Sequence, residues 1–178
     1  GDAGNDSIDG GTGTNVFDLS AEANAVVVNL SNGTAVGTSI GSDTVANFAH
    51  VIGTGQDDDL TANAGSDTTL DGGAGNDTLT GVAGDDTLNG GTGNDTIDGG
   101  SGDDDIDAGA DNDTILASLG DDAIDGGTGT DLYNASAATG SVVANLTNGT
   151  ASGTGIGNDT LVNITAVDGS AQNDDLTG

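Results

Sequence analysis

Residues 72–107 read GGAGNDTLTGVAGDDTLNGGTGNDTIDGGSGDDDID, a glycine-rich acidic motif of nine residues that occurs four times in succession. Windows of nine residues laid from Gly72 continue for seven copies and end at Asn134. One apolar or aromatic residue fills the eighth slot of each window: Leu79, Leu88, Ile97, Ile106, Ile115, Ile124 and Tyr133. Neither a helix nor an ordinary strand has a period of nine, so a short fixed period with one buried slot predicts a solenoid.

The sixth slot of every window is an aspartate: Asp77, Asp86, Asp95, Asp104, Asp113, Asp122 and Asp131. The fifth slot alternates between Asn and Asp, from Asn76 and Asp85 onward, until Thr130 interrupts it. The true period is therefore 18 residues, and we expect one coil to contain two nonapeptides that turn at opposite edges. The apolar slot and its two neighbours form a very short strand whose central side chain points into a thin core.

Looser copies of the motif extend the array and predict four regions. Residues 1–18 are nonapeptide repeats, 19–52 wider solenoid coils, 53–134 the main array, and 135–178 a second copy of the wider coils that runs into a repeat. Residues 16–62 align with 132–178 at an offset of 116, and 24 of the 47 positions are identical. In the wider coils we expect Val36 and Val45 in the apolar slot; a separately folded small β domain is the alternative.

Composition shows that the chain needs cations from outside. Its 30 acidic residues face no Lys or Arg, which gives a formal net charge of -30, and Leu, Ile, Val and Phe make up about a fifth of the residues. That combination lies at the border of intrinsic disorder. The charge repels nucleic acid and anionic membrane surfaces and attracts cations. No apolar run long enough to span a membrane is present, and the absence of Cys excludes disulfides and thiolate metal sites.

Catalytic chemistry finds little support in the chain, which we expect not to be an enzyme. His50 is the only histidine, and Ala166 occupies the equivalent position of the second copy, so a Ser-His-Asp arrangement is not credible. Adjacent carboxylates such as Asp103 and Asp104 recur as part of the repeat and therefore do not indicate a glycosidase pair.

The glycines and aspartates together indicate calcium. Glycines allow positive φ and tight turns whose carbonyls point inward, and Ca²⁺ takes about 6 to 8 oxygens at about 2.3 to 2.6 Å from carbonyls and carboxylates. Stacking places Asp77 above Asp95, Asp113 and Asp131 at one edge, and Asp86 above Asp104 and Asp122 at the other. Such columns repel themselves unless cations lie between successive coils, so we expect several calcium ions.

The pattern GGxGxDxUx, where U is aliphatic, resembles the calcium-binding repeats of the RTX family, closely over residues 53–134 and loosely elsewhere. The resemblance implies a parallel β-roll in which each ion lies between loops i and i+2. One implied site comprises Gly73, Gly75 and Asp77 facing Gly90, Thr92 and Asp95; the next comprises Val82, Gly84 and Asp86 facing Gly99, Ser101 and Asp104. The same register adds Asp6, Asp43, Asp58 and Asp159 as metal ligands.

Several positions depart from the family pattern and predict weaker sites. Val82 replaces a glycine, so it can offer its carbonyl only if a β-branched residue tolerates the required backbone conformation. Asp111 replaces the third glycine of its window, Ala117 and Ser118 replace a glycine pair, and Asn15 replaces the sixth-slot aspartate.

The leading functional expectation is a structural module folded by Ca²⁺ in a large secreted or cell-surface protein of a Gram-negative bacterium, such as an adhesin stalk, surface layer or filament. The resemblance implies type I export. The alternative is the C-terminal region of a type I secreted protease or lipase. A third possibility, an ice-binding face, needs regular Thr ladders, which fail at Asp105 and Ala123. Both ends of the sequence lie within repeats, so we expect the coil to continue covalently or by end-to-end self-association.

Overall fold

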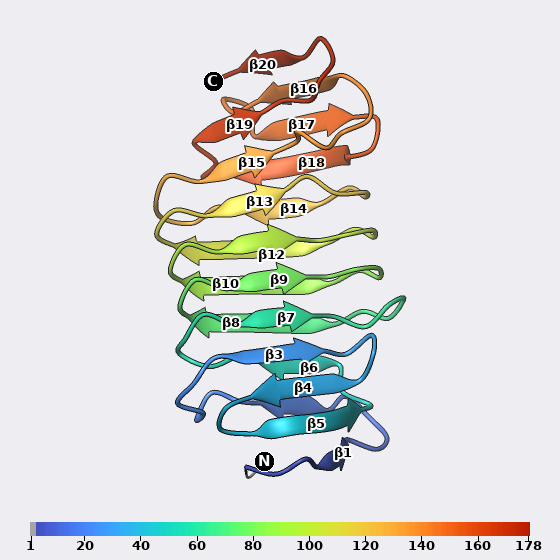
Figure 1. Cartoon of the computed structure of the whole chain (residues 1–178). Helices are drawn as coiled ribbons and strands as arrows, with labels where there is room; N and C mark the ends of the chain where they lie inside the picture. Colours follow the sequence, from blue (N-terminus) through green and yellow to red (C-terminus); the bar gives the residue numbers. More distant parts are fainter. Residues whose placement is uncertain (1–2) are drawn as a thin grey trace.

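The computed structural model describes residues 3–178, which fold into strands and turns and contain no helix. Two ten-stranded sheets face each other along the length of the molecule, and the chain crosses between them at each half-coil. Figure 1 shows the coils of the main array stacked in sequence order, with the two termini at opposite ends of the molecule. The predicted parallel β-roll is therefore confirmed.

Sheet A contains, in spatial order, β1 (Ser7–Asp9), β5 (Gly41–Ala46), β4 (Thr34–Gly37), β3 (Val26–Asn29), β7 (Asp59–Thr61), β9 (Thr78–Thr80), β11 (Thr96–Asp98), β13 (Thr114–Leu116), β15 (Leu132–Asn134) and β19 (Ala166–Asp168). Sheet B contains β2 (Val16–Asp18), β6 (His50–Ile52), β8 (Thr69–Ala74), β10 (Thr87–Thr92), β12 (Asp105–Ala110), β14 (Ala123–Asp125), β18 (Gly157–Val162), β17 (Thr150–Gly153), β16 (Val142–Asn145) and β20 (Asp175–Thr177).

The central coils are stacked in parallel with an 18-residue register. Leu88 of β10 pairs with Ile106 of β12, and Ile97 of β11 pairs with Ile115 of β13. Every eighth-slot residue of the main array is buried, which confirms the predicted core positions. Burying one such side chain stabilises the fold by about 1.5–3 kcal/mol, whereas ordering each backbone residue costs about 1–2 kcal/mol. A core that buries one such side chain in every nine residues therefore stabilises the fold only weakly against the cost of ordering the backbone.

The segments 19–52 and 135–168 differ from the expected wider coils. In the first, β3, β4 and β5 form an antiparallel meander that lies within sheet A, and in the second, β16, β17 and β18 form the same meander within sheet B. The expectation that Val36 points into the core is wrong: Val36 is 44% exposed and its neighbour Ala35 is buried. Val45 is buried as predicted. The meanders share the core of the roll and form no separate domain.

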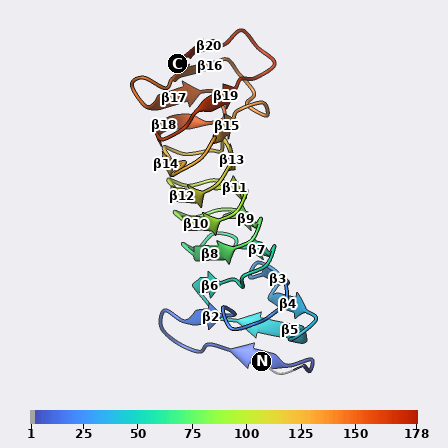
Figure 2. The same ribbon diagram turned by 90° about the vertical axis from the view of Figure 1, so that its left-hand side faces the viewer.

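The two meanders lie on opposite sides of the roll. The chain crosses between the sheets an odd number of times from β3 to β16, so equivalent strands fall in different sheets. Figure 2 shows β3, β4 and β5 on one side of the stack and β16, β17 and β18 on the other. The two copies of the long repeat consequently place their meander strands on opposite faces of the roll.

Candidate metal centre

The acidic loops of the main array form two edges. Edge 1 comprises the segments that lead from sheet B to sheet A, here called loops although three of them begin with the last residues of β8, β10 and β12: residues 53–58, 72–77, 90–95, 108–113 and 126–131. Edge 2 comprises the loops that run from sheet A to sheet B, residues 62–68, 81–86, 99–104 and 117–122. Loop 10–15, between β1 and β2, also runs in the edge 2 direction. From residue 72 to residue 134, sixth-slot aspartates of one edge therefore recur every 18 residues along the stack.

These aspartates form one hydrogen-bonded column at each edge. At edge 1, the Asp77 N–H donates to Asp95 Oδ1 at 2.7 Å, and the Asp95 N–H donates to Asp113 Oδ1 at 2.8 Å. Edge 2 repeats the pattern from Asp86 to Asp104 at 2.8 Å and onward to Asp122. The stacking expected from the spacing is thus present, and each carboxylate uses one oxygen to tie its coil to the preceding one.

The second carboxylate oxygen of most column members has no hydrogen-bond partner among residues 3–178. These buried Oδ2 atoms belong to Asp43, Asp77, Asp86, Asp95, Asp104, Asp113 and Asp131. An unpaired buried acceptor costs about 1–3 kcal/mol, and more when it carries charge. The sequence offers no Lys or Arg to pair with them. Their charge has to be neutralised by a bound cation or by protonation.

Backbone carbonyls lie beside these unpaired oxygens. A methyl carbon placed on Gly72 would lie 2.5 Å from Asp77 Oδ2 and 2.6 Å from Gly90 O, the carbonyl of the next edge 1 loop. At Gly90 the same construction gives 2.5 Å to Asp95 Oδ2 and also meets Ala108 O, the carbonyl of the following edge 1 loop. A carboxylate oxygen and a carbonyl oxygen therefore face one small space, which a side chain on the first-slot glycine would fill.

The second and fourth slots of most loops hold left-handed backbone conformations. Gly73 has a φ of 99° and Gly75 a φ of 124°. Val82 and Asp111, which replace glycines at these slots, adopt the same region with φ values of 72° and 84°. Val82 therefore keeps the loop path of its glycine counterparts, although this conformation is unfavourable for a β-branched residue.

Burial raises the pKa of several carboxylates in the two columns. The pKa rises to about 7 for Asp95 and Asp104, chiefly because burial disfavours the charged form, while the hydrogen bond from the preceding backbone N–H opposes the rise. The pKa of Asp77 rises to about 6 for the same reason. These environments penalise a bare carboxylate and favour one whose charge is neutralised.

The donor set fits a hard cation that accepts carbonyl ligands. No cluster of three or more His, Cys, Asp or Glu side chains suited to hold a metal occurs in residues 3–178, so backbone carbonyls have to complete any coordination shell. Mixed carboxylate and carbonyl oxygen ligands suit Ca²⁺, whereas Mg²⁺ requires a small octahedron and usually keeps several waters. The unpaired Oδ2 atoms and the adjacent carbonyls therefore fit calcium.

Comparison with protein families decides the assignment. The model of the RTX calcium-binding nonapeptide repeat matches residues 1–24, 52–88, 68–97, 80–115 and 98–133, which together cover more than half of the chain. The chain belongs to the RTX calcium-binding repeat family. No curated protein matches it significantly. As an RTX β-roll it is a calcium-binding structural repeat and not itself a catalytic fold.

The structure separates the predicted RTX ligands into two groups. Seven predicted aspartates carry the unpaired oxygens described above, whereas Asp58, Asp122 and Asp159 have hydrogen-bond partners for Oδ2 in Thr54 N, Ser118 Oγ and the Tyr133 hydroxyl. Asp6 lies beside this set, because its N–H donates to Asp43 Oδ1 at 2.8 Å. The predicted carbonyl donors lie in the loops of the two edges: Gly73, Gly75, Val82, Gly84, Gly90, Thr92, Gly99 and Ser101.

The sequence analysis did not identify the side chains that donate hydrogen bonds to carboxylates of the repeat. A hydroxyl in the second slot donates to the aspartate four residues later at three places: Thr54 to Asp58, Ser118 to Asp122 and Ser170 to Asp174, at 3.1, 3.0 and 2.7 Å. The exchange of a second-slot glycine for Ser or Thr was the available signal. Tyr133 left no comparable local signal because its partner, Asp159, lies 26 residues away.

An outer ladder of fifth-slot residues distinguishes the two edges. At edge 1 the Asn94 N–H donates to Asn76 Oδ1, and Asn112 repeats the contact. At edge 2 the Asp103 N–H donates to Asp85 Oδ1, and Asp121 repeats it. These side chains are exposed, so edge 2 has a second column of negative charge where edge 1, after Asp57, has the neutral amides of Asn76, Asn94 and Asn112.

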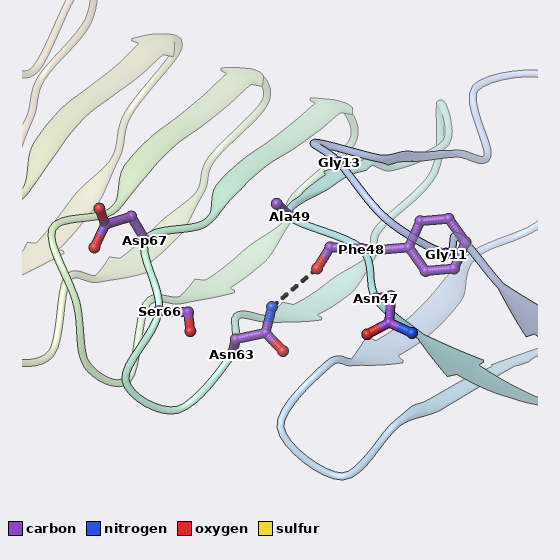
Figure 3. Close-up of a pocket in the computed structure, with 8 residues that line it drawn as sticks. All are labelled: Gly11, Gly13, Asn47, Phe48, Ala49, Asn63, Ser66 and Asp67. Atoms are coloured by element: carbon purple, nitrogen blue, oxygen red, sulfur yellow. Dashed lines mark hydrogen bonds between the residues drawn. The ribbon is translucent and has the colours of Figure 1, made fainter.

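An open pocket of about 310 Å³ lies at the edge 2 side, where the stack of nonapeptide loops is interrupted. It lies between Gly11 and Gly13 of loop 10–15 and Ser66 and Asp67 of loop 62–68 (Figure 3). The chain enters β6 here without a complete nonapeptide loop, and the Asn63 side chain donates to the Phe48 carbonyl at 2.9 Å across the gap. His50 does not line the pocket, and the lining suggests no catalytic group.

Proposed function

We propose that this RTX segment is a calcium-folded structural β-roll that extends a large secreted or cell-surface protein, as in an adhesin stalk, a surface layer or a filament. The observation that carries the proposal is the set of seven buried, unpaired carboxylate oxygens in a chain without Lys or Arg. When bound, Ca²⁺ supplies the missing positive charge. Asp77, Asp86, Asp95 and Asp104 would bind it together with carbonyls of their own and the next loop.

The shape of the molecule supports extension as the role. Both sheets run the full length of the described chain, and the core continues from the first meander to the second. A solenoid of this kind lengthens by adding copies, because each coil contacts only its neighbours. The ice-binding possibility has weak support, since Thr87 is aligned with Asp105 and then Ala123 on the outer face of sheet B.

Calcium dependence of folding tests the proposal. Metal binding energy becomes folding energy when the site does not exist in the unfolded chain. Circular dichroism of the calcium-free chain at neutral pH should show a disordered spectrum, and millimolar Ca²⁺ should produce a β spectrum and a smaller hydrodynamic radius. Mg²⁺ at the same concentration is the matched control and should have little effect. A compact β spectrum in chelator at neutral pH would rule the proposal out.

The alternative role, a C-terminal RTX region of a type I secreted protease or lipase, shares the same calcium-dependent fold. The parent protein distinguishes the two roles. A stalk or filament, whose coils continue covalently or by end-to-end association, should shorten or dissolve in chelator with no loss of turnover. A secreted hydrolase should instead contain an HExxH or GxSxG motif outside these residues. Type I export and an extracellular location are part of both proposals.

No helix long and apolar enough to cross a membrane occurs in the described part of the chain.

A further inference from the structure

The two copies of the long repeat differ at positions that contact the aspartate columns. The offset of 116 residues aligns Asn15 with Asp131, Phe17 with Tyr133, and Asp43 with Asp159. The first two pairs differ in residue type, and each exchange adds or removes a hydrogen-bond donor beside a buried oxygen, whereas Asp43 and Asp159 are identical. The two copies therefore provide an internal comparison of the same backbone with different donors.

In the first copy, the Asn15 amide supplies a donor where carbonyls converge. Asn15 Nδ2 lies 2.9 Å from Asn47 O, 3.3 Å from Gly13 O and 3.4 Å from Gly11 O. Figure 3 shows Gly11 and Gly13 on a segment separate from Asn47. Three carbonyl oxygens thus surround one amide nitrogen, as they would surround a small cation.

In the second copy, Asp131 occupies the equivalent position and brings no donor. Asp131 Oδ1 accepts the Asp113 N–H at 3.0 Å, but the buried Oδ2 has no partner in residues 3–178. A methyl carbon on Gly126 would lie 3.1 Å from Asp131 Oδ2 and 2.9 Å from Asn163 O. Two acceptor oxygens therefore face the same space, an arrangement that a cation bound between them would stabilise.

The second pair of positions shows the opposite difference. Asp159 Oδ1 accepts the Asp122 N–H at 3.2 Å, and its Oδ2 accepts the hydroxyl of the fully buried Tyr133 from the other sheet. Asp43 Oδ1 likewise accepts the Asp6 N–H, but its buried Oδ2 has no partner in the described chain. Phe17, the counterpart of Tyr133, has no hydroxyl to offer.

We propose that the Asn15 amide and the Tyr133 hydroxyl each take the place of a calcium ion. The first copy then binds its ion at Asp43, and the second copy binds its ion at Asp131. Each copy therefore binds calcium at the position where the other copy has a hydrogen-bond donor instead. This inference rests on the proposed function, since it assumes that the unpaired carboxylates of the columns bind Ca²⁺. It adds that Asp159 is not a metal ligand and that loop 10–15 holds its carbonyls together without an ion.

Four single variants test this inference by their calcium stoichiometry, measured with Ca²⁺ alone by titration calorimetry and native mass spectrometry. Asn15→Asp should add one ion, because it replaces the donor with a carboxylate facing the same carbonyls. Asp131→Asn is its matched counterpart and should remove one. Tyr133→Phe should add one ion at Asp159, and Phe17→Tyr should remove one at Asp43.

Unchanged stoichiometry in all four variants, with several ions bound to the wild type, would overturn this inference and leave the calcium-folded roll intact. A wild type that binds no calcium would instead overturn the proposed function. Circular dichroism in saturating calcium accompanies each count. If Asn15→Asp fails to fold there, no ion has entered loop 10–15; if Phe17→Tyr fails to fold, its hydroxyl does not reach Asp43. Either result contradicts the proposal at that position.

Discussion

At the scale of single residues, Val82 and Asp111 adopt backbone conformations that other repeats assign to glycine. Val82 has a φ of 72° where Gly73 and Gly91 have φ values of 99° and 103°. A non-glycine residue held in a sparsely populated region costs about 1–3 kcal/mol. Contacts with the next coil explain why the loop keeps this path. Gly100 packs directly against the Val82 backbone, and the Ser101 N–H donates to Val82 O at 3.2 Å.

Val82→Gly should therefore stabilise the calcium-bound roll. Relief of strain exceeds the entropic cost of a new glycine, about 0.5–1 kcal/mol, so we expect a net gain of about 1 kcal/mol and a melting temperature about 2–4 °C higher. Thermal unfolding in saturating calcium measures it. Ala83→Gly is the control, since Ala83 has no positive φ and the added glycine should lower stability. Equal losses in both variants would show that Val82 is unstrained.

The residue scale also shows what spacing can predict about the site. A fixed distance of 18 residues was enough to predict the columns of Asp77 and Asp86, because identical coils stack in register. Spacing could not show that Asp159 contacts Tyr133 or that the Asn15 amide meets three carbonyls. Those contacts join different strands or loops, and they depend on where side chains converge in the folded chain.

At the scale of the strands and columns, the meanders were the least predictable elements. Residues 26–46 contain alternating apolar residues that fit either a coil or an antiparallel strand, and a shift of one residue exchanges the buried and exposed faces. The register chosen by β3 and β4 pairs Val27 with Val36 on the outer face and Val28 with Ala35 on the inner face. Only the pairing with β5 and β7 fixes that choice.

The columns themselves predict how the calcium-free roll responds to pH. Burial raises the pKa of Asp86 and Asp113 to about 6 and that of Asp95 and Asp104 to about 7. A carboxyl whose pKa is higher in the folded chain stabilises the fold below its unfolded pKa of about 3.9. That stability is lost as the pH rises through the folded pKa values. A proton on Oδ2 can also donate to the facing carbonyl, as between Asp77 and Gly90.

We therefore expect the calcium-free chain to show β structure near pH 4.5 and to lose it as the pH approaches 8. Circular dichroism across this range, with calcium removed beforehand, measures the transition, and Ca²⁺ added at pH 8 should restore the spectrum. Molar salt is the control, because it screens exposed charges far more than buried ones; the transition should persist in it. More β structure at pH 8 than at pH 4.5 would contradict the assignment of the buried columns.

At the scale of the whole molecule, adding or removing one nonapeptide has a different effect on the sheets than adding or removing a whole coil of two. One nonapeptide carries the chain from one sheet to the other, whereas two return it to the same sheet. Any odd number of nonapeptides between the meanders places them on opposite sides, as Figure 2 shows. Removing one nonapeptide should therefore leave each half of the roll intact and transfer everything after the deletion to the other sheet.

Deletion of residues 90–98 tests this expectation, because the chain has no cysteine and engineered pairs report neighbours without interference. In the intact chain Thr87 is paired with Asp105 in sheet B, while Thr78 lies in sheet A beside Thr96. After the deletion, Asp105 should stack on Thr78, because the apolar slot and both loop types are retained. Paired strands bring Cα atoms within disulfide range. The pair Thr78→Cys with Asp105→Cys should therefore oxidise only in the deletion variant, and Thr87→Cys with Asp105→Cys only in the intact chain.

Deletion of residues 90–107, a whole coil, is the control: Thr87→Cys with Ala123→Cys should then form the disulfide, since both residues stay in sheet B. A Thr87–Asp105 disulfide that survives the nine-residue deletion would show that the roll loops out a strand and does not change sheets.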